Sequence, residues 1–507
     1  MKRFAVLVLA LLGGAVPIAA LAGGGDITDP ARNLAIPCEY VSGPAMAARS
    51  NRNISHLANV CGFVGTDVEF QSRRDLAGQV HDYAFVGTMG AGFRIYDVTD
   101  PDHPKRAGGY LDPGWQNDVQ VHGDVVVSTF DGLVGEDSTG STCLKSKNAS
   151  GQGVDIVRLD YNELTATFET NLLTCVGNPP GGAHNSTLHP SGDWLAISNC
   201  CSDWSMDLID LRQAEQGVAT HRYRFVDESR QASAGRCPAG AAFTCVVVTR
   251  PDGSSASGLW DPHDIHFSRD GRTMYVAAIE STFIVDVSRA LDGKVRTVAI
   301  VPHSDGMTVS HQADVTSDGK LLVVSDEAGG GVSNTDCNTT PQGFMGALHF
   351  YALAPIKGVA QSTGAKPSAP RKLGIYVNPR PTLAIDPLDG ILATLPRTER
   401  GCTVHVFRLG GNGTSSPGAG EAAFDGVSTL PDRELVTAWY GGGTWWVDFS
   451  GAPSSTDGIP EDPRTTWGNT RGWSVMPGAD TWSAKEYKGH VYTGDMLRGF
   501  DVFRLAR

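Results

Sequence analysis

Four histidines occupy equivalent places in a repeated sequence pattern. His184, His263 and His311 each lie eight residues before the glycine of a predicted turn, and His405 lies in a later copy of the pattern. Imidazole is a common ligand of Zn, Cu and Fe, and ligands far apart in sequence can share one coordination sphere. The spacing therefore predicts a candidate site for one transition metal ion: Cu, Zn or Fe.

Polar groups recur at a second equivalent place, after the next predicted strand of the pattern. Asp203, Glu280 and Glu327 are candidates for orienting the imidazoles, or for acting as a general base on a metal-bound water. The same place also carries Asp326, next to Glu327, and in other copies Asp131, Tyr440 and Asp495. A histidine cluster beside a collar of carboxylates is a coherent hypothesis for a metal site.

The elements that would position these residues are short strands. Alternating or β-branched runs bounded by Gly, Asp, Asn and Pro recur along the chain, whereas long amphipathic helical patterns are scarce. In the clearest copy, the runs 263–268, 273–279, 282–287 and 295–301 follow one another, with a turn at 269–271. This four-strand unit predicts an all-β protein.

The unit repeats along the mature chain. Seven copies predict a single β-propeller with seven four-stranded blades, although the pattern leaves six or eight blades open. The last copy ends after its third strand, so we expect the N-terminal segment 57–63 to supply the fourth and close the ring, which leaves no unpaired sheet edge. A domain boundary would cut this ring, and the propeller is therefore expected to be one domain.

The first strand of each blade lines the axis of a propeller, so residues at one repeat position form a ring at the mouth of the central channel. In chain order the ring reads Thr66, Asn117, His184, His263, His311, His405 and Trp482. Four histidines thus fall on four consecutive blades. Two interpretations stay open: the imidazoles bind a metal or polar ligand, or they hydrogen-bond neighbouring blades and fill the channel mouth.

The segments 92–101, 282–287 and 442–448 resemble the LVIVD-repeat family of exported bacterial and archaeal propellers, and 262–276 resembles the related YVTN repeat. The resemblance covers most of the mature chain. It implies the propeller fold and no specific activity, because the family supports several roles. The first two units depart from the pattern, since they lack the histidine. The axial histidines also resemble, in architecture alone, those of selenium-binding-protein-like propellers, which implies a metal that oxidises small thiols.

The N-terminus has the features of a secretory signal. Two basic residues precede an apolar stretch, and a small-x-small cleavage site ends at Ala22. We expect residues 1–22 to be a signal peptide, 23–55 an N-terminal extension and 56–507 the propeller, in a periplasmic or secreted protein. No other segment reaches the roughly 20 apolar residues of a transmembrane helix.

The formal net charge of −14 gives the chain no basic field with which to hold a phosphate backbone. Nucleic acid is therefore excluded as a partner. The sequence contains no GxSxG elbow, no HExxH and no Walker-type phosphate loop, so hydrolase and nucleotide-binding functions have no support. A closed ring buries its own sheet edges, and we expect a monomer.

The ten cysteines are expected to pair, because export places them in an oxidising compartment. Their spacing favours the local pairs Cys38–Cys61, Cys143–Cys175, Cys237–Cys245 and Cys337–Cys402. The neighbours Cys200 and Cys201 have three alternatives: a vicinal disulfide, pairing elsewhere, or reduced thiols that act as soft metal ligands.

Two functions are compatible with these features. The first, which we favour, is a non-catalytic binding or scaffold module at the cell envelope, whose insertions 132–153, 227–260 and 329–346 contact an envelope protein, a glycan or a small molecule. The second is a metalloprotein that oxidises a small molecule or hydrolyses it with metal assistance. Its candidate metal ligands are His184, His263, His311 and His405.

Overall fold

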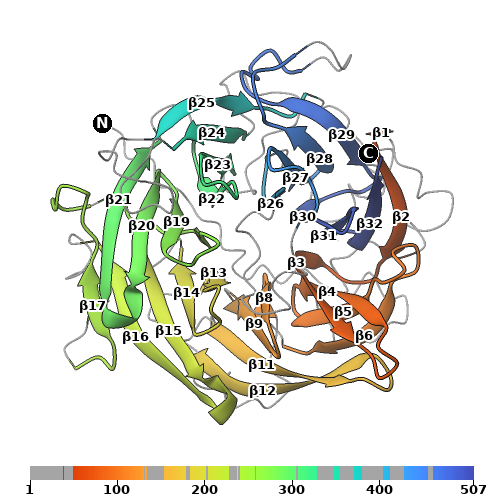
Figure 1. Ribbon diagram of the computed structural model, residues 1–507, viewed down its shortest axis with the longest axis horizontal. Helices are drawn as coiled ribbons and strands as arrows, with labels where there is room; N and C mark the ends of the chain where they lie inside the picture. Colours follow the sequence, from red (N-terminus) through yellow and green to blue (C-terminus); the bar gives the residue numbers. More distant parts are fainter. Residues whose placement is uncertain are drawn as a thin grey trace, which may run out of the picture.

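Seven antiparallel sheets surround a central axis in the computed structural model of the chain (Figure 1). Each sheet is a meander whose inner strand comes first in the blade, so the predicted all-β, seven-bladed propeller is confirmed. The structure describes residues 38, 50–112, 114–130, 132–133 (backbone), 153–177, 183–200, 204–227, 237, 240–256, 258–303, 307–327, 346–353, 370–379, 403–411, 428–454 and 461–506.

Each of the first four blades is built from strands that follow one another in the sequence. Blade 1 consists of β3 (Gly65–Arg74), β4 (Val80–Thr88), β5 (Phe93–Asp97) and β6 (Lys105–Tyr110). Blade 2 consists of β8 (Asp118–His122), β9 (Val125–Phe130), β11 (Gly153–Asn162) and β12 (Thr167–Gly177). Blade 3 consists of β13 (Asn185–Leu188), β14 (Trp194–Asn199), β15 (Ser205–Gln213), β16 (Val218–Val226) and the parallel β17 (Thr244–Val247). Blade 4 consists of β18 (Asp264–Phe267), β19 (Thr273–Ala278), β20 (Ser281–Arg289) and β21 (Lys294–Pro302).

The last three blades continue the same order. Blade 5 consists of β22 (Ser310–Val315), β23 (Leu321–Asp326), β24 (Leu348–Ala352) and β25 (Arg371–Tyr376). Blade 6 consists of β26 (Phe407–Leu409), β27 (Glu434–Ala438), β28 (Thr444–Asp448) and β29 (Asn469–Val475). Blade 7 contains β30 (Thr481–Tyr487), β31 (His490–Asp495) and β32 (Gly499–Leu505). Outside the blades lie the paired β7 (Gly114–Trp115) and β10 (Gly132–Leu133), and two 3-10 turns, η4 (Ala214–Gln216) and η5 (Ala290–Asp292).

The N-terminal segment closes the ring at two blades. β2 (Ile54–Val60) pairs antiparallel with β32 and supplies the fourth strand of blade 7, which confirms the predicted closure, although the strand begins and ends three residues before the predicted segment 57–63. β1 (Ser50–Arg52), which the sequence does not predict, pairs with β29 and adds a fifth strand to blade 6. In Figure 1 both strands lie beside the C-terminal end of the chain. One continuous segment therefore covers the outer edges of two neighbouring blades.

The cysteine predictions are confirmed as far as the described residues reach. Cys38–Cys61 and Cys237–Cys245 are disulfides. Cys175 and Cys200 are also disulfide-bonded, so the alternative in which Cys200 stays reduced does not hold in this structure. The remaining members of the predicted pairs lie outside the described residues: Cys143, Cys201, Cys337 and Cys402.

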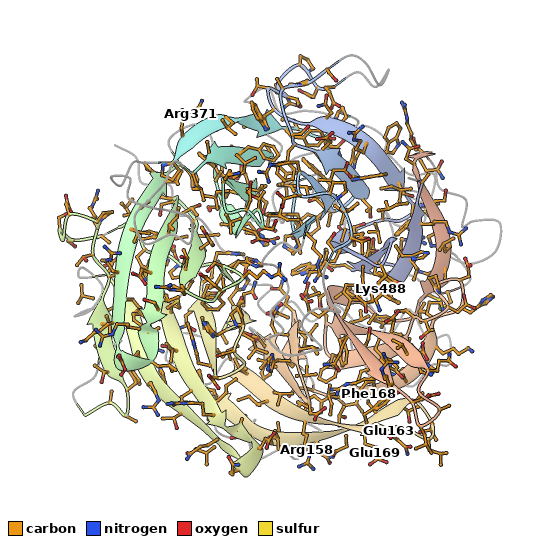
Figure 2. All side chains as sticks on the ribbon, viewed as in Figure 1. Arg158, Glu163, Phe168, Glu169, Arg371 and Lys488 are labelled. Carbon is orange, nitrogen blue, oxygen red and sulfur yellow. A yellow bond between two sulfur atoms is a disulfide. The ribbon has the colours of Figure 1, made fainter. Side chains whose placement is uncertain are left out.

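The hydrophobic core lies between the blades. One cluster joins Leu348 and Phe350 of blade 5 to Trp445 and Trp473 of blade 6, and the two Trp rings stack with centroids 5.6 Å apart. The alternation of each strand sends its apolar side chains to the adjacent sheets, which accounts for the β-branched and aromatic runs. Figure 2 shows side chains filling the spaces between the blades, with charged residues such as Arg158 on the outer rim.

The direction of the strands determines on which of the two faces of the ring each connecting loop lies. Because neighbouring strands are antiparallel, the first strand of each blade begins on the face where the second and fourth strands end. We call this the histidine face, since the four candidate histidines lie at the starts of β13, β18, β22 and β26. The insertions predicted after 131, 226 and 328 leave the ring on this face; apart from β17 and its neighbours, they lie mostly outside the described residues.

No helix within the described ranges has the length and apolar character needed to cross a bilayer.

Candidate functional site

The start of each inner strand fixes a histidine at the histidine face. The backbone N–H of His184 donates to the Ser198 carbonyl (2.9 Å), and that of His263 donates to the Ala277 carbonyl (2.7 Å). His405 is held in the same way by a carbonyl at the end of β27, while His311 lies within β22. These bonds tie each histidine to the second strand of its own blade and place equivalent side chains at the channel mouth.

The four imidazoles form a continuous row across blades 3 to 6. The ring centroids are 4.4 Å apart for His184 and His263, 4.4 Å for His263 and His311, and 4.1 Å for His311 and His405. The Nε2 atoms of His184 and His263 are 3.1 Å apart, which requires one of them to carry the proton. The structure thus brings together all four histidines that the repeat pattern selects.

Glu327 is the carboxylate that the structure places against this row. It follows β23 directly, is buried, and has its Oε2 3.9 Å from His311 Nε2 and its Oε1 3.5 Å from His405 Nε2. Ligand atoms of His263, His311 and Glu327 all lie within 4.8 Å of one another. Around a tetrahedral Zn²⁺ the ligand atoms are about 3.4 Å apart, so small side-chain rotations would close this triad on an ion.

Tyr440 holds Glu327 in place from blade 6. Its hydroxyl donates to Glu327 Oε1 at 2.6 Å, and its ring packs against His405 with centroids 4.7 Å apart. The Tyr440 backbone has φ 39°, in the left-handed region that bulky residues rarely adopt. Backbone strain of this kind persists where the surroundings require a particular side-chain direction.

His405 has a defined tautomer. Its Nδ1 lies 2.5 Å from the carbonyl oxygen of Trp482, which accepts only, so Nδ1 carries the proton. The lone pair is then on Nε2, the atom that faces Glu327. The Trp482 ring packs against His405 with centroids 4.5 Å apart and ends the row of histidines at blade 7.

Two buried nitrogens of the row lack hydrogen-bond partners among the described residues: His263 Nδ1 and His311 Nδ1. Both side chains are buried, with relative exposures of 5% and 4%. Burial, assisted by the neighbouring imidazoles, holds the pKa of His263 and His311 well below the usual histidine value, and burial lowers the pKa of His405 to about 3. His263, His311 and His405 are therefore neutral imidazoles, which is the protonation state that binds metals.

The carboxylates beside the row are shifted in the opposite direction. Burial raises the pKa of Glu327 to about 7 and that of Asp326 to about 6. Asp326 Oδ1 accepts the backbone N–H groups of Thr308 and Val309. Glu327 is the carboxylate that lies within reach of His263 and His311, and the charge of a bound cation would favour its ionised form.

Cys200 occupies in blade 3 the place that Glu327 occupies in blade 5, directly after the second strand. Its sulfur and one ring nitrogen from each of His184 and His263 lie within 4.8 Å of one another. The residue directly following the second strand is thus the repeat position that adds a second donor to the histidine row.

The other predicted carboxylates do not join the cluster in the described part of the chain. Glu280 is exposed in the turn after β19, and Asp203 lies outside the described residues. Ile279 takes the place directly after the second strand of blade 4, with φ 53°, and Glu280 follows it outward. A residue must therefore follow the second strand directly to add a donor to the histidine row, which is a stricter requirement than the sequence pattern indicates.

An apolar patch beside the row is absent from the sequence prediction. Val64, Met89, Tyr440 and Met496 form one buried cluster, with Trp482 packed against it. Met89 and Met496 again follow directly after second strands, β4 and β31. Alignment of that single position across the blades is the signal that would have found them.

Comparison with known proteins supports no family assignment. A search with the sequence finds no matching family model and no matching curated protein. Among solved structures, the β-propeller domain of Cps50 (Swd1) from Myceliophteria thermophila is similar over 90% of this chain and 100% of its own, at 9% identity and a TM-score of 0.47. A functionally unknown protein from Desulfotomaculum acetoxidans is similar over 76% of this chain and 84% of its own, at 12% identity and a TM-score of 0.40. The seven-bladed architecture rests on the strand order of this chain itself.

Proposed function

We propose that this chain is an exported binding propeller of the cell envelope and that its ligand at the histidine face is one transition metal ion. His263, His311 and Glu327 are the proposed ligands, and His405 Nε2 is the nearest further donor. The observation that carries the proposal is the convergence of ring nitrogens on a buried carboxylate: donor atoms of His263, His311 and Glu327 lie within 4.8 Å of one another, and His405 Nε2 lies 3.5 Å from Glu327 Oε1. Two further buried ring nitrogens, His263 Nδ1 and His311 Nδ1, have no partner among the described residues, which indicates that hydrogen bonding within the fold does not account for this cluster.

The donor set favours Zn²⁺ or Cu²⁺. Imidazole nitrogen suits both ions, and a carboxylate oxygen is a common third ligand. Tyr440 would orient Glu327 through its hydroxyl hydrogen bond, as groups behind a ligand do in many metal sites. The Trp482 carbonyl would fix the tautomer of His405 in the same way.

Burial favours binding over catalysis. His263, His311, His405 and Glu327 are each at most 5% exposed. Catalytic metal sites keep a coordination position open to substrate, whereas structural sites are closed by protein groups. We therefore do not favour small-molecule oxidation or metal-assisted hydrolysis at this site, and propose that an envelope protein or a glycan is the partner of the propeller as a whole.

The export part of the proposal rests on the N-terminal leader sequence and on the disulfides. Disulfides persist outside the reducing cytosol, and Cys38–Cys61 and Cys237–Cys245 are both formed. The mature chain would begin near Gly23, after the cleavage site at Ala22.

Elemental analysis by mass spectrometry tests the metal. The protein is purified from periplasm without a metal-affinity tag, and wild type is compared with His263→Ala/His311→Ala and with His103→Ala/His490→Ala, two histidines outside the row. We expect about one Zn or Cu per wild-type chain, retained by the control and lost by the site variant. A wild-type chain with an intact fold that neither carries the metal nor takes up added Zn²⁺ or Cu²⁺ would contradict the proposal.

A further inference from the structure

Cys200 forms a second donor triad with two of the same histidines. Its sulfur, a ring nitrogen of His184 and a ring nitrogen of His263 all lie within 4.8 Å of one another, and Cys200 is 5% exposed. In this structure the sulfur is part of a disulfide. A disulfide sulfur is a poor ligand compared with a thiolate, so the triad lacks its third strong donor while that bond is intact.

Cys200 and Glu327 occupy the same repeat position, directly after the second strand of their blade. The triad of Cys200 takes histidines from its own blade and the next, whereas the triad of Glu327 takes His311 from its own blade and His263 from the preceding one. His263 belongs to both triads. The two donor sets are therefore adjacent along one row, and they differ chiefly in a sulfur against a carboxylate.

We propose that reduction of the Cys200 disulfide creates a thiol-dependent metal site made of His184, Cys200 and His263. Its preferred ions are Zn²⁺ and Cu⁺, because a thiolate is a softer donor than a carboxylate. This inference rests on the proposed function in that His263 serves both sites. An ion that passes from one site to the other keeps His263 as a ligand.

The chemistry needs an external reductant, for which a dithiol is sufficient. The dithiol attacks the disulfide, the S–S bond of Cys200 breaks, and the dithiol is oxidised to a cyclic disulfide. Its two electrons and two protons pass to the protein sulfurs, which become two thiols. The metal ion then binds Cys200 as the thiolate and releases that thiol proton to solvent.

Co²⁺ serves as the spectroscopic probe, because thiolate-to-cobalt charge transfer absorbs in the near ultraviolet and imidazole or carboxylate ligands give no such band. The mature chain is titrated with Co²⁺ before and after treatment with dithiothreitol and removal of the reagent, and circular dichroism monitors the fold. We expect the charge-transfer band after reduction alone, and its loss in Cys200→Ser. Cys245→Ser, which affects a disulfide elsewhere in blade 3, is the matched control and should keep the band. No band in the reduced, folded wild type, or a band that survives in Cys200→Ser, would overturn the inference.

A second measurement guards against a Cys200→Ser chain that fails to fold. Reduced wild type is alkylated with iodoacetamide with and without Zn²⁺, and modification is read peptide by peptide. Zn²⁺ should slow alkylation of Cys200 and leave Cys245 unchanged; equal rates at Cys200 would overturn the inference.

The Glu327→Gln variant separates a failure of the proposed Glu327 site from a failure of the proposed Cys200 site. If both hold, this variant loses Co²⁺ binding in the oxidised protein and keeps the thiolate band after reduction. Oxidised wild type that binds no metal, together with a band after reduction, would overturn the Glu327 site and support the Cys200 site. The reverse result would overturn the Cys200 site alone.

Discussion

On blades 3 to 6 the ring position at the channel mouth holds an imidazole, whereas on blades 1 and 2 it holds Thr66 and Asn117. The Thr66 hydroxyl donates to the Asn117 carbonyl at 2.6 Å. The Asn117 amide donates to the carbonyls of Thr88 (2.5 Å) and Gly114 (3.0 Å) and accepts from Ser128 Oγ (3.1 Å). Each side-chain polar atom of Thr66 and Asn117 thus has a partner in the backbone or a neighbouring side chain, whereas in the histidine row His263 Nδ1 and His311 Nδ1 have none among the described residues.

The repeat position at the channel mouth does not itself require an imidazole. On blades 1 and 2, Thr66 and Asn117 occupy this position with smaller polar side chains that hydrogen-bond to backbone carbonyls. His263 and His311 keep a buried Nδ1 without a partner among the described residues. Since the same blade geometry is built without imidazoles on blades 1 and 2, the fold does not require imidazoles at this position, and this contrast supports the proposed metal site.

Substitution by leucine at two copies of this position should change the free energy of unfolding by very different amounts, measured in metal-free protein at pH 8. Asn117→Leu orphans three buried hydrogen-bonding groups and should destabilise the fold by about 3–5 kcal/mol. His311→Leu removes a partnerless nitrogen and should change the free energy of unfolding by about 1 kcal/mol or less, in either direction. Urea unfolding measures both. A His311→Leu penalty as large as that of Asn117→Leu would show that the imidazole is structural.

The pH dependence of stability gives the second contrast. The lowered pKa values of His263 and His311 mean that the unfolded chain takes up protons below pH 6.5 that the folded chain excludes, so these histidines destabilise the fold as the pH falls. Relative to metal-free wild type, His263→Leu/His311→Leu should gain about 3 kcal/mol of stability per pH unit of acidification below pH 6.5.

Glu327 acts with the opposite sign. Its pKa of about 7 lets the folded chain hold a proton that the unfolded chain releases above about pH 4.5, so its contribution to stability is lost as the pH rises through that window. Glu327→Gln should therefore lose stability relative to wild type on acidification from pH 7, by about 1.4 kcal/mol per unit. His103→Leu, at an exposed histidine, is the control for the histidine variants. Parallel pH profiles for wild type and all variants would contradict the assigned shifts.

The smallest expected effect tests the support of Glu327. Tyr440→Phe removes the hydroxyl that donates to Glu327 Oε1 and should weaken Zn²⁺ binding by about 10–100-fold with the fold intact. Competition with a chromophoric chelator measures the affinity. Tyr492→Phe, at a buried tyrosine between blades 7 and 1, is the matched control and should leave it unchanged. Equal affinities for Tyr440→Phe and wild type would remove Tyr440 from the site.

The sequence predicts the propeller and the histidine row because both depend on spacing that repeats. The eight-residue interval from histidine to turn glycine sets the register of the first strand, and the register places His184, His263 and His311 at the same height on successive blades. The missing fourth strand of the last unit likewise predicts β2, since an open edge in a ring has one obvious partner.

The residues that add a donor from the end of a second strand are harder to predict than the histidines. Insertions begin where second strands end, so the repeat spacing does not fix which residue comes directly after the strand. Asp203 matches the pattern by composition, yet Cys200 is the residue directly after β14. Glu280 matches in type but follows Ile279, whose left-handed backbone already occupies the position. The pairing of β1 with β29 could not be predicted from the repeat, because blade 6 already has four strands and β1 is a fifth.

Because the ring is closed by strands far apart in sequence, the N-terminal strands are synthesised long before the strands with which they pair. The His56 ring nitrogen Nε2 meets Asp501 Oδ1 at 2.7 Å across 445 residues of chain, so the ribosome makes one half of this contact 445 residues before the other. At about 5–20 residues per second, the interval is on the order of 20 to 90 s. β1 has no sheet to join until β29 is made and β2 has none until β32 is made, so blades 6 and 7 stay incomplete through most of this interval. A chain released early would lack β32 and leave the ring open.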